Sequence, residues 1–161
     1  APARSGRGCS AGRRPRPPRV QAGRGQEVVA EMNRVGVLCD LSHVGAQTSE
    51  EVILTSEKPV TYSHCLPTGL KEHPRNKSDK ELKFIADHGG FVGVTMFTPF
   101  MKNGVNSTIE DYVEAIKYCH NICGEDSIGI GTDFTQGHGY DFFEWLTYDY
   151  HKVQKKMAVL K

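Results

Sequence analysis

The chain has 161 residues, of which 38% are hydrophobic and 24% are charged, a composition that can build a globular core. No stretch approaches the roughly 20 consecutive apolar residues that a membrane-spanning helix needs, so we expect no membrane span. The five cysteines form no Cys-x-x-Cys pair. An odd, scattered set argues against a disulfide scaffold and for a reducing compartment. We therefore expect a cytoplasmic protein, and leave open a periplasmic or membrane-anchored full-length form.

The first 24 residues differ sharply from the rest. They contain seven arginines, four prolines, four glycines and no acidic residue, whereas residues 25–161 contain thirteen basic and nineteen acidic residues, a net charge of −6. Such a segment cannot build a core, so we predict a disordered tail over residues 1–24. It lacks lysine and aromatic residues, which favours a non-native extension over a nucleic-acid arm, and we expect no nucleic-acid partner. A transit peptide is a further alternative.

Beyond the tail, helical and extended patterns alternate. Apolar residues spaced from Val28 to Val35 predict a helix that ends at Gly36, and the run 37–43 predicts a first buried strand. Three more strands are predicted over residues 59–64, 91–97 and 127–133. Capping boxes predict the starts of the intervening helices at Thr48 with Glu51, at Ser78 with Glu81, and at either Ser107 with Glu110 or Thr108 with Asp111.

This alternation predicts an α/β protein with a parallel sheet. The strands are continuous apolar runs, as expected when both faces of a sheet are covered. Strand–helix repeats of this kind form right-handed βαβ units. An open doubly wound sheet and part of a (β/α)8 barrel both fit the pattern. No glycine-rich phosphate-binding motif follows a strand, which counts against a nucleotide-binding protein.

Polar residues stand at the ends of the predicted strands, where parallel α/β folds carry their functional groups. His43, His64 and Asp133 end the first, second and fourth strands. Imidazole and carboxylate are usual zinc ligands, so these three residues are candidate metal ligands. Glycines at 129 and 131 are predicted to leave space beneath Asp133. The remaining histidines (73, 88, 120, 138 and 151) are interpreted as solvated or structural, and the cysteines at 39, 65, 119 and 123 as core or near-core residues.

Five segments together resemble one enzyme family. They are residues 27–36, 40–44, 59–64, 73–76 and 129–134, the last reading Gly-Ile-Gly-Thr-Asp-Phe. In this order and spacing they resemble the zinc dipeptidases of the renal, or membrane, dipeptidase family. Residues 132–137 resemble the bacterial branch in particular. The resemblance implies a (β/α)8 barrel with two zinc ions at its mouth and hydrolysis of dipeptides, and a homodimer is compatible with it.

The resemblance also implies a role for each candidate residue. His43 and His64 match the two histidines that bind the second zinc ion. Arg75 matches the arginine that holds the C-terminal carboxylate of the substrate, a task suited to a planar guanidinium. Asp133 matches the catalytic aspartate, which also contacts the first zinc ion and can transfer a proton to the leaving amine.

Two departures from the family pattern qualify this expectation. Thr135 stands where many relatives have a second aspartate, as in the bacterial branch. Nothing before Gln26 matches the family's His-x-Asp motif, its metal-bridging glutamate or its substrate-contacting histidine. We therefore expect residues 25–161 to form the C-terminal half of a (β/α)8 barrel, about four βα units, behind an unrelated leader. A catalytically incompetent half-barrel, or another metal-dependent barrel amidohydrolase, is the alternative.

Overall fold

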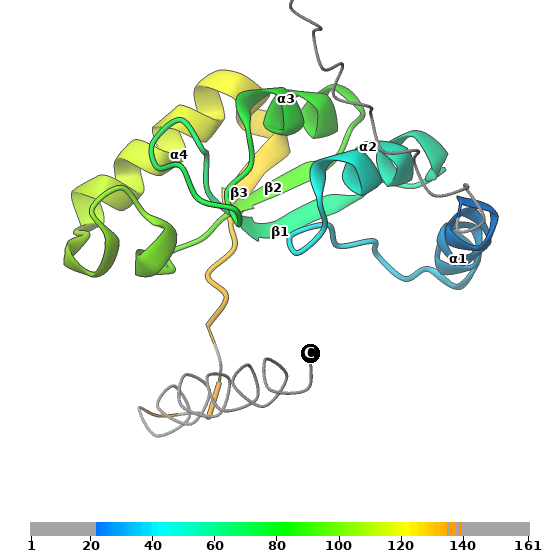
Figure 1. Cartoon of the computed structure of the whole chain (residues 1–161), viewed down its shortest axis with the longest axis horizontal. Coiled ribbons are helices and arrows are strands. Elements are labelled where there is room, and N and C mark those ends of the chain that lie inside the picture. Colours follow the sequence, from blue (N-terminus) through cyan, green and yellow to red (C-terminus); the bar gives the residue numbers. More distant parts are fainter. Residues whose placement is uncertain (1–21, 135, 138, 140–161) are drawn as a thin grey trace, which may run out of the picture.

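Three parallel strands and the helices between them make up the described part of the chain (Figure 1). The structure is a computed structural model, and it describes residues 22–134, 136, 137 and 139. The helices are α1 (Ala22–Val35), α2 (Ala46–Thr55), α3 (Asp79–Asp87) and α4 (Ile109–Cys123). The strands are β1 (Thr61–Cys65), β2 (Phe91–Val94) and β3 (Ile128–Ile130). Short 3-10 helices are η1 (Thr98–Phe100), η2 (Gly104–Asn106) and η3 (Glu125–Ser127).

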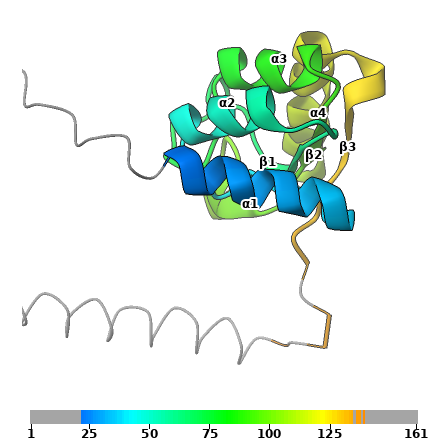
Figure 2. The same ribbon diagram turned by 90° about the vertical axis from the view of Figure 1, so that its right-hand side faces the viewer.

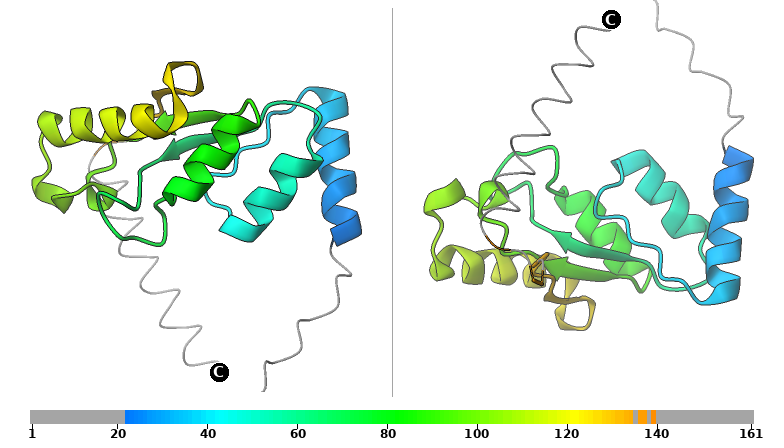
Figure 3. Two further views of the ribbon diagram at one scale, coloured as in Figure 1. Left: turned by 90° about the horizontal axis from the view of Figure 1, so that it is seen from above. Right: turned by 90° about the horizontal axis from the view of Figure 1, so that it is seen from below.

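The sheet has the order β1-β2-β3, and both neighbouring pairs are parallel. Helix α3 connects β1 to β2 and α4 connects β2 to β3, so the predicted βαβ repetition is confirmed for these units. Helices α2, α3 and α4 lie over one face of the sheet, while α1 lies beyond its end (Figures 1 and 2). Seen from the other side, no helix of the described residues covers the strands (Figure 3).

The predicted tail boundary falls inside a helix. Helix α1 begins at Ala22, so residues 22–24 belong to its first turn, and residues 1–21 lie outside the described residues. The helix ends where the sequence predicted, because Gly36 adopts a φ of 76°, a conformation that glycine adopts at low cost. No helix among the described residues is both long and apolar enough to cross a membrane.

The prediction of a full buried strand over residues 37–43 is wrong. This segment forms only an isolated parallel bridge between Asp40 and Thr61, with backbone bonds on either side of it. Val37 and Leu38 are 51% and 60% exposed. The segment lies beside β1 at the edge of the described sheet, so it has a pairing partner on one side only. The described residues therefore contain three strands with a fourth segment alongside.

The core lies between the sheet and the helices that cover it. Its completely buried side chains are Tyr62, Leu82, Ile85, Val92, Val94 and Cys119. The alternation of side chains between the two faces of β1 is interrupted, because Tyr62 and Cys65 both lie in the core although they are three residues apart. A register shift in the pairing with β2 occurs between these two residues. Burial raises the pKa of the Cys119 thiol to about 12, which fits the interpretation of the cysteines as core residues.

Glycines allow the three strands to approach closely on the other face. A Cβ added at Gly131 or at Gly93 would collide with the carbonyl oxygen of Ser63, and the two glycine Cα atoms are near neighbours. The expected open space beneath Asp133 is therefore wrong at Gly131, since the backbone of β1 fills it. At Gly129, a Cβ would meet the Phe91 ring at 2.6 Å. These glycines serve strand packing rather than a ligand cavity.

Two of the three predicted helix starts are confirmed. Ser78 and Glu81 form a reciprocal capping box at α3, and the Asp111 carboxylate accepts a hydrogen bond from the Thr108 backbone at α4. The prediction at Thr48 is wrong, because α2 begins directly after Gly45 and Thr48 lies inside its first turn. A Ser/Thr-x-x-Glu pattern can thus fall within a helix as well as at its start.

Because Ser78 caps a helix and Thr48 does not, substitution by alanine should affect stability at the first residue and not at the second. Ser78→Ala should lower the free energy of unfolding by about 1 kcal/mol, because the backbone N–H of Glu81 loses its acceptor. Thr48→Ala is the matched control. It should change stability by less than about 0.5 kcal/mol, since Thr48 is exposed and does not cap α2. Urea unfolding of both variants measures the difference, and equal losses would contradict the assignment.

Candidate functional site

Four residues from separate parts of the sequence meet at the carboxyl ends of the strands. His43 lies in the segment before α2, His64 on β1, Arg75 in the loop after β1, and Asp133 after β3. The Nε2 atoms of His43 and His64 are 3.0 Å apart, and Nε2 of His64 is 3.9 Å from Oδ2 of Asp133. The structure thus brings all four predicted site residues into one cluster.

Arg75 lies against both imidazoles. Its Nη2 is 2.9 Å from Nε2 of His43 and 3.5 Å from Nε2 of His64, and its Nη1 donates to the carbonyl of Ser42. A guanidinium has donors only, so it must donate to the lone pair of His43 Nε2. Burial, together with the positive charge of Arg75, lowers the pKa of His43 and favours its neutral form.

Buried neighbours hold the loop that carries Arg75. Asn76 and Lys77 are only 7% and 5% exposed. Nδ2 of Asn76 donates to the carbonyl of Phe100 at 3.0 Å, and Nζ of Lys77 donates to the carbonyl of Val44 at 2.7 Å. Burial lowers the pKa of Lys77. Because Val44 follows His43, these bonds tie the arginine loop to the segment that presents the first histidine.

Asp40 joins that segment to β1, and the sequence analysis did not identify it. Its carboxylate accepts four hydrogen bonds, from the backbone N–H and the hydroxyl of both Ser42 and Ser63, at 2.5–3.1 Å. Burial alone would raise its pKa, but the bonds from Ser42 and Ser63 outweigh burial and hold the pKa at about 2. The signal for Asp40 was local: an Asp-x-Ser turn within an apolar run just before His43.

Asp133 lies on irregular backbone beyond the sheet. Strand β3 ends at Ile130, so the expected alternation from Gly129 through Gly131 does not extend to Asp133. Its φ of 59° lies in the left-handed region, which aspartate tolerates better than most residues. The side chain is 45% exposed. Thr135, which was compared with the family aspartate, lies outside the described residues.

The two histidines fit a shared metal ion. Zn–N bonds of about 2.0–2.1 Å place two ligands of a tetrahedral ion about 3.3 Å apart, close to the 3.0 Å between the His43 and His64 nitrogens. Within the described ranges, however, no three His, Cys, Asp or Glu side chains are grouped closely enough to hold a metal. His43 and His64 could therefore supply only part of a ligand set. Asp133 is near, but its carboxylate is not in the position of a third ligand.

The other described histidines have structural contacts or lie in solvent, as expected. His73 packs on Phe100 with ring centroids 4.5 Å apart, and its Nδ1 accepts from the backbone N–H of Arg75. The Nδ1 of His88 is 2.7 Å from the carbonyl of Phe84, and His120 is exposed on α4. Residues 138 and 151 lie outside the described residues.

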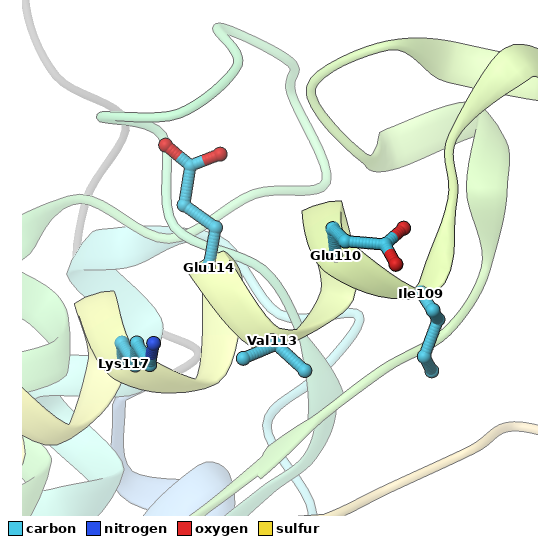
Figure 4. Close-up of a pocket in the computed structure, with 5 residues that line it drawn as sticks. All are labelled: Ile109, Glu110, Val113, Glu114 and Lys117. Carbon is cyan, nitrogen blue, oxygen red and sulfur yellow. The ribbon is translucent and has the colours of Figure 1, made fainter.

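A pocket on α4 is separate from this cluster (Figure 4). It is lined by Ile109, Glu110, Val113, Glu114 and Lys117. All five come from one helix, and none is a predicted site residue. Glu114 pairs with Lys102 at 2.9 Å, so its carboxylate already has a partner. The pocket adds nothing to the candidate site.

Comparisons with known proteins identify the family. The model of the membrane dipeptidase family, peptidase family M19, matches residues 21–154. Among curated proteins, the chain is 33% identical over 120 residues to an uncharacterized dipeptidase of Schizosaccharomyces pombe. The match covers 73% of this chain and 29% of that protein. The chain is also 34% identical over 110 residues to dipeptidase verJ of Clonostachys rogersoniana. That match covers 68% of this chain and 28% of that protein.

Solved structures give the same result. An amidohydrolase from Pseudomonas aeruginosa is 80% identical, with a TM-score of 0.73, and the match covers 79% of this chain and 39% of that one. A metallopeptidase from Rhodobacter sphaeroides, solved with a phosphinate mimic of the dipeptide L-Ala-D-Ala, is 30% identical. Its TM-score is 0.64, and the match covers 68% of this chain and 32% of that one.

The α/β fold of this chain is thus shared with solved metallopeptidases. The chain belongs to the membrane dipeptidase family, a family of metal-dependent hydrolases. It spans about three tenths of the length of the curated relatives it matches. The predicted family is confirmed.

Proposed function

We propose that the chain supplies one wall of the active site of a zinc-dependent dipeptidase, as the C-terminal half of a (β/α)8 barrel. His43 and His64 bind one metal ion, Arg75 binds the C-terminal carboxylate of the dipeptide, and Asp133 transfers the proton. The convergence of these four side chains, from the segment before α2, from β1 and the loop after it, and from the backbone after β3, carries the proposal. The dipeptide substrate follows from the names of its relatives.

Each residue has a chemical task that suits its surroundings. His43 and His64 would hold a zinc ion through their Nε2 lone pairs. The chemistry that the ion would supply there is polarisation of the scissile carbonyl of the substrate. Asp133 lies 3.9 Å from Nε2 of His64 and is partly exposed, so its carboxylate can accept a proton at the site and release it to the leaving amine.

Arg75 lies where it can bind the substrate and orient it against the imidazoles. Its guanidinium contacts both histidines in this structure, so a dipeptide carboxylate would bind within a few ångströms of the metal-binding nitrogens. Carboxylate and guanidinium pair through two parallel hydrogen bonds, which fixes the direction of the peptide bond relative to Asp133.

Substitution of Arg75 by lysine tests this role. Activity is measured in an extended protein, in which this chain replaces the matching segment of the Pseudomonas aeruginosa amidohydrolase. Arg75→Lys should lower kcat/KM for dipeptides by about ten- to a hundredfold, the loss of a charged hydrogen bond worth about 1.5–3 kcal/mol. Zinc content should stay unchanged. The deficit should shrink for dipeptides with an amidated C-terminus, and equal losses on both substrates would contradict the carboxylate contact.

Zinc titration of the 161-residue chain tests the metal site itself. Two imidazoles leave a zinc ion short of the three or four protein ligands that it normally takes, so we expect weak binding of a single ion. His43→Ala and His64→Ala should each abolish it, whereas His120→Ala on the exposed face of α4 should not. Competition with a chromophoric chelator measures all four proteins. Zinc binding that survives both site substitutions would overturn the assignment.

A further inference from the structure

The hydrogen-bonded chain from Asp40 to His64 determines where the proton of one imidazole lies. The Asp40 carboxylate has acceptors only, so the hydroxyl of Ser63 must donate its single proton to Oδ2 of Asp40. The same hydroxyl is 2.8 Å from Nδ1 of His64. Having no second proton to give, Ser63 can only accept there, and Nδ1 of His64 must carry the proton.

No neighbouring hydroxyl changes this assignment of protons. Oγ of Ser42 is 3.2 Å from Oγ of Ser63, but it is 2.6 Å from Oδ1 of Asp40 and donates its proton there. Oγ of Ser42 also accepts the backbone N–H of His64 at 3.1 Å. Both serines therefore send their protons to Asp40 and both accept from His64, so they hold the ring and its backbone together.

We infer that Asp40, acting through Ser63, is a positioning residue that keeps neutral His64 in its Nδ1–H tautomer and leaves the Nε2 lone pair free for a metal ion. The inference rests on the proposed function in one respect, the identity of the ligand at Nε2. The tautomer itself follows from the hydrogen bonds alone. Outer partners of this kind commonly orient metal-binding histidines and change metal affinity by 10- to 100-fold.

The surroundings of His64 Nε2 show what this tautomer requires of the site. Nε2 faces Nε2 of His43 at 3.0 Å and Nη2 of Arg75 at 3.5 Å. The His43 nitrogen is itself an acceptor, because Arg75 donates to it at 2.9 Å. With the proton of His64 on Nδ1, two nitrogen lone pairs face each other at 3.0 Å, a contact that is unfavourable in the metal-free chain and that a shared cation would relieve.

The isosteric substitution Asp40→Asn distinguishes this role from simple support of the fold. The asparagine oxygen can keep accepting the two backbone N–H groups, while its amide nitrogen replaces Oδ2 and becomes a donor to Ser63. The Ser63 hydroxyl must then donate to Nδ1 of His64. The proton of the ring moves to Nε2, where it competes with the metal.

Long-range proton–nitrogen NMR of the metal-free chain, labelled with ¹⁵N-histidine, reads the tautomer directly. The spectra are recorded at about pH 8. We expect Nδ1–H for His64 in the native chain, Nε2–H in Asp40→Asn, and loss of the Nδ1–H preference in Ser63→Ala. The control Asp126→Asn, in the exposed helix η3, should leave the native pattern. Zinc affinity should fall by about 10- to 100-fold in Asp40→Asn and Ser63→Ala only.

These readouts separate the inference from the proposed function. A proton on Nε2 of His64 in the native chain, or Nδ1–H retained in Asp40→Asn, would overturn the inference whatever the metal content. If the zinc affinity stays unchanged while the tautomer of His64 changes, the link between the tautomer and metal binding is wrong. If the tautomer changes as expected while the native chain takes up no zinc, the inference about Asp40 holds and the proposed metal site fails.

Discussion

His64→Ala in the extended protein is expected to remove zinc and dipeptide hydrolysis together. The side chain contributes one of the two Nε2 atoms that lie 3.0 Å apart, and alanine leaves His43 as a single imidazole. Loss of outer partners already costs 10- to 100-fold in metal affinity, so loss of a ligand should cost more than about 100-fold. Metal analysis after dialysis and an assay of dipeptide hydrolysis measure both effects.

His120→Ala is the control for this experiment, because His120 is exposed on α4. It should retain full zinc content and activity. If His64→Ala retained zinc and lost only activity, His64 would be a substrate contact and the metal assignment would be wrong. The same substitution at His43 should match His64→Ala in both readouts, since the two rings present their nitrogens to one place.

Asp133→Asn is expected to lower turnover by about 10²- to 10⁴-fold, the usual contribution of a group that transfers protons. The amide preserves the shape of the side chain but cannot accept the proton. Asparagine also tolerates the left-handed backbone, so the φ of 59° should not strain the variant. The kcat of the extended protein at saturating zinc and dipeptide measures the effect, and KM should change much less.

Asp126→Asn serves as the matched control, since this aspartate lies in the exposed helix η3. It should behave like the parent protein. A loss of kcat at Asp133 that disappears when more zinc is added would show a metal ligand rather than a proton-transferring group. An unchanged kcat at saturating zinc would exclude Asp133 from the chemistry.

The helices and the inner strands of this fold could be predicted because their signals are local. Gly36 and Gly124 end helices through positive φ angles, and Ser78 starts one through its capping box. The segment 37–43 was predicted as a strand from its apolar residues. Whether such a run becomes a strand depends on partners on both sides, which its own residues do not determine, and here it pairs only with β1.

The candidate site could be predicted in part for a similar reason. His43, His64 and Asp133 are placed near one another by the rule that carboxyl ends of parallel strands meet at one edge. The contact of Arg75 with both imidazoles depends on the path of its loop, which Asn76 and Lys77 anchor from within the core. The role of Asp40 depends on Ser63, twenty-three residues away, and a contact at that distance leaves no spacing pattern in the sequence.

We propose that this cluster belongs to a metal-dependent dipeptidase. The extended protein is assayed on a panel of dipeptides, including L-Ala-D-Ala, after zinc is removed and added back stepwise. We expect hydrolysis to disappear with the metal, to return in proportion to the zinc bound, and not to return in the His43→Ala, His64→Ala double variant. Hydrolysis that persists without metal, or that zinc restores equally in the double variant, would show that the cluster is not a metal-dependent site.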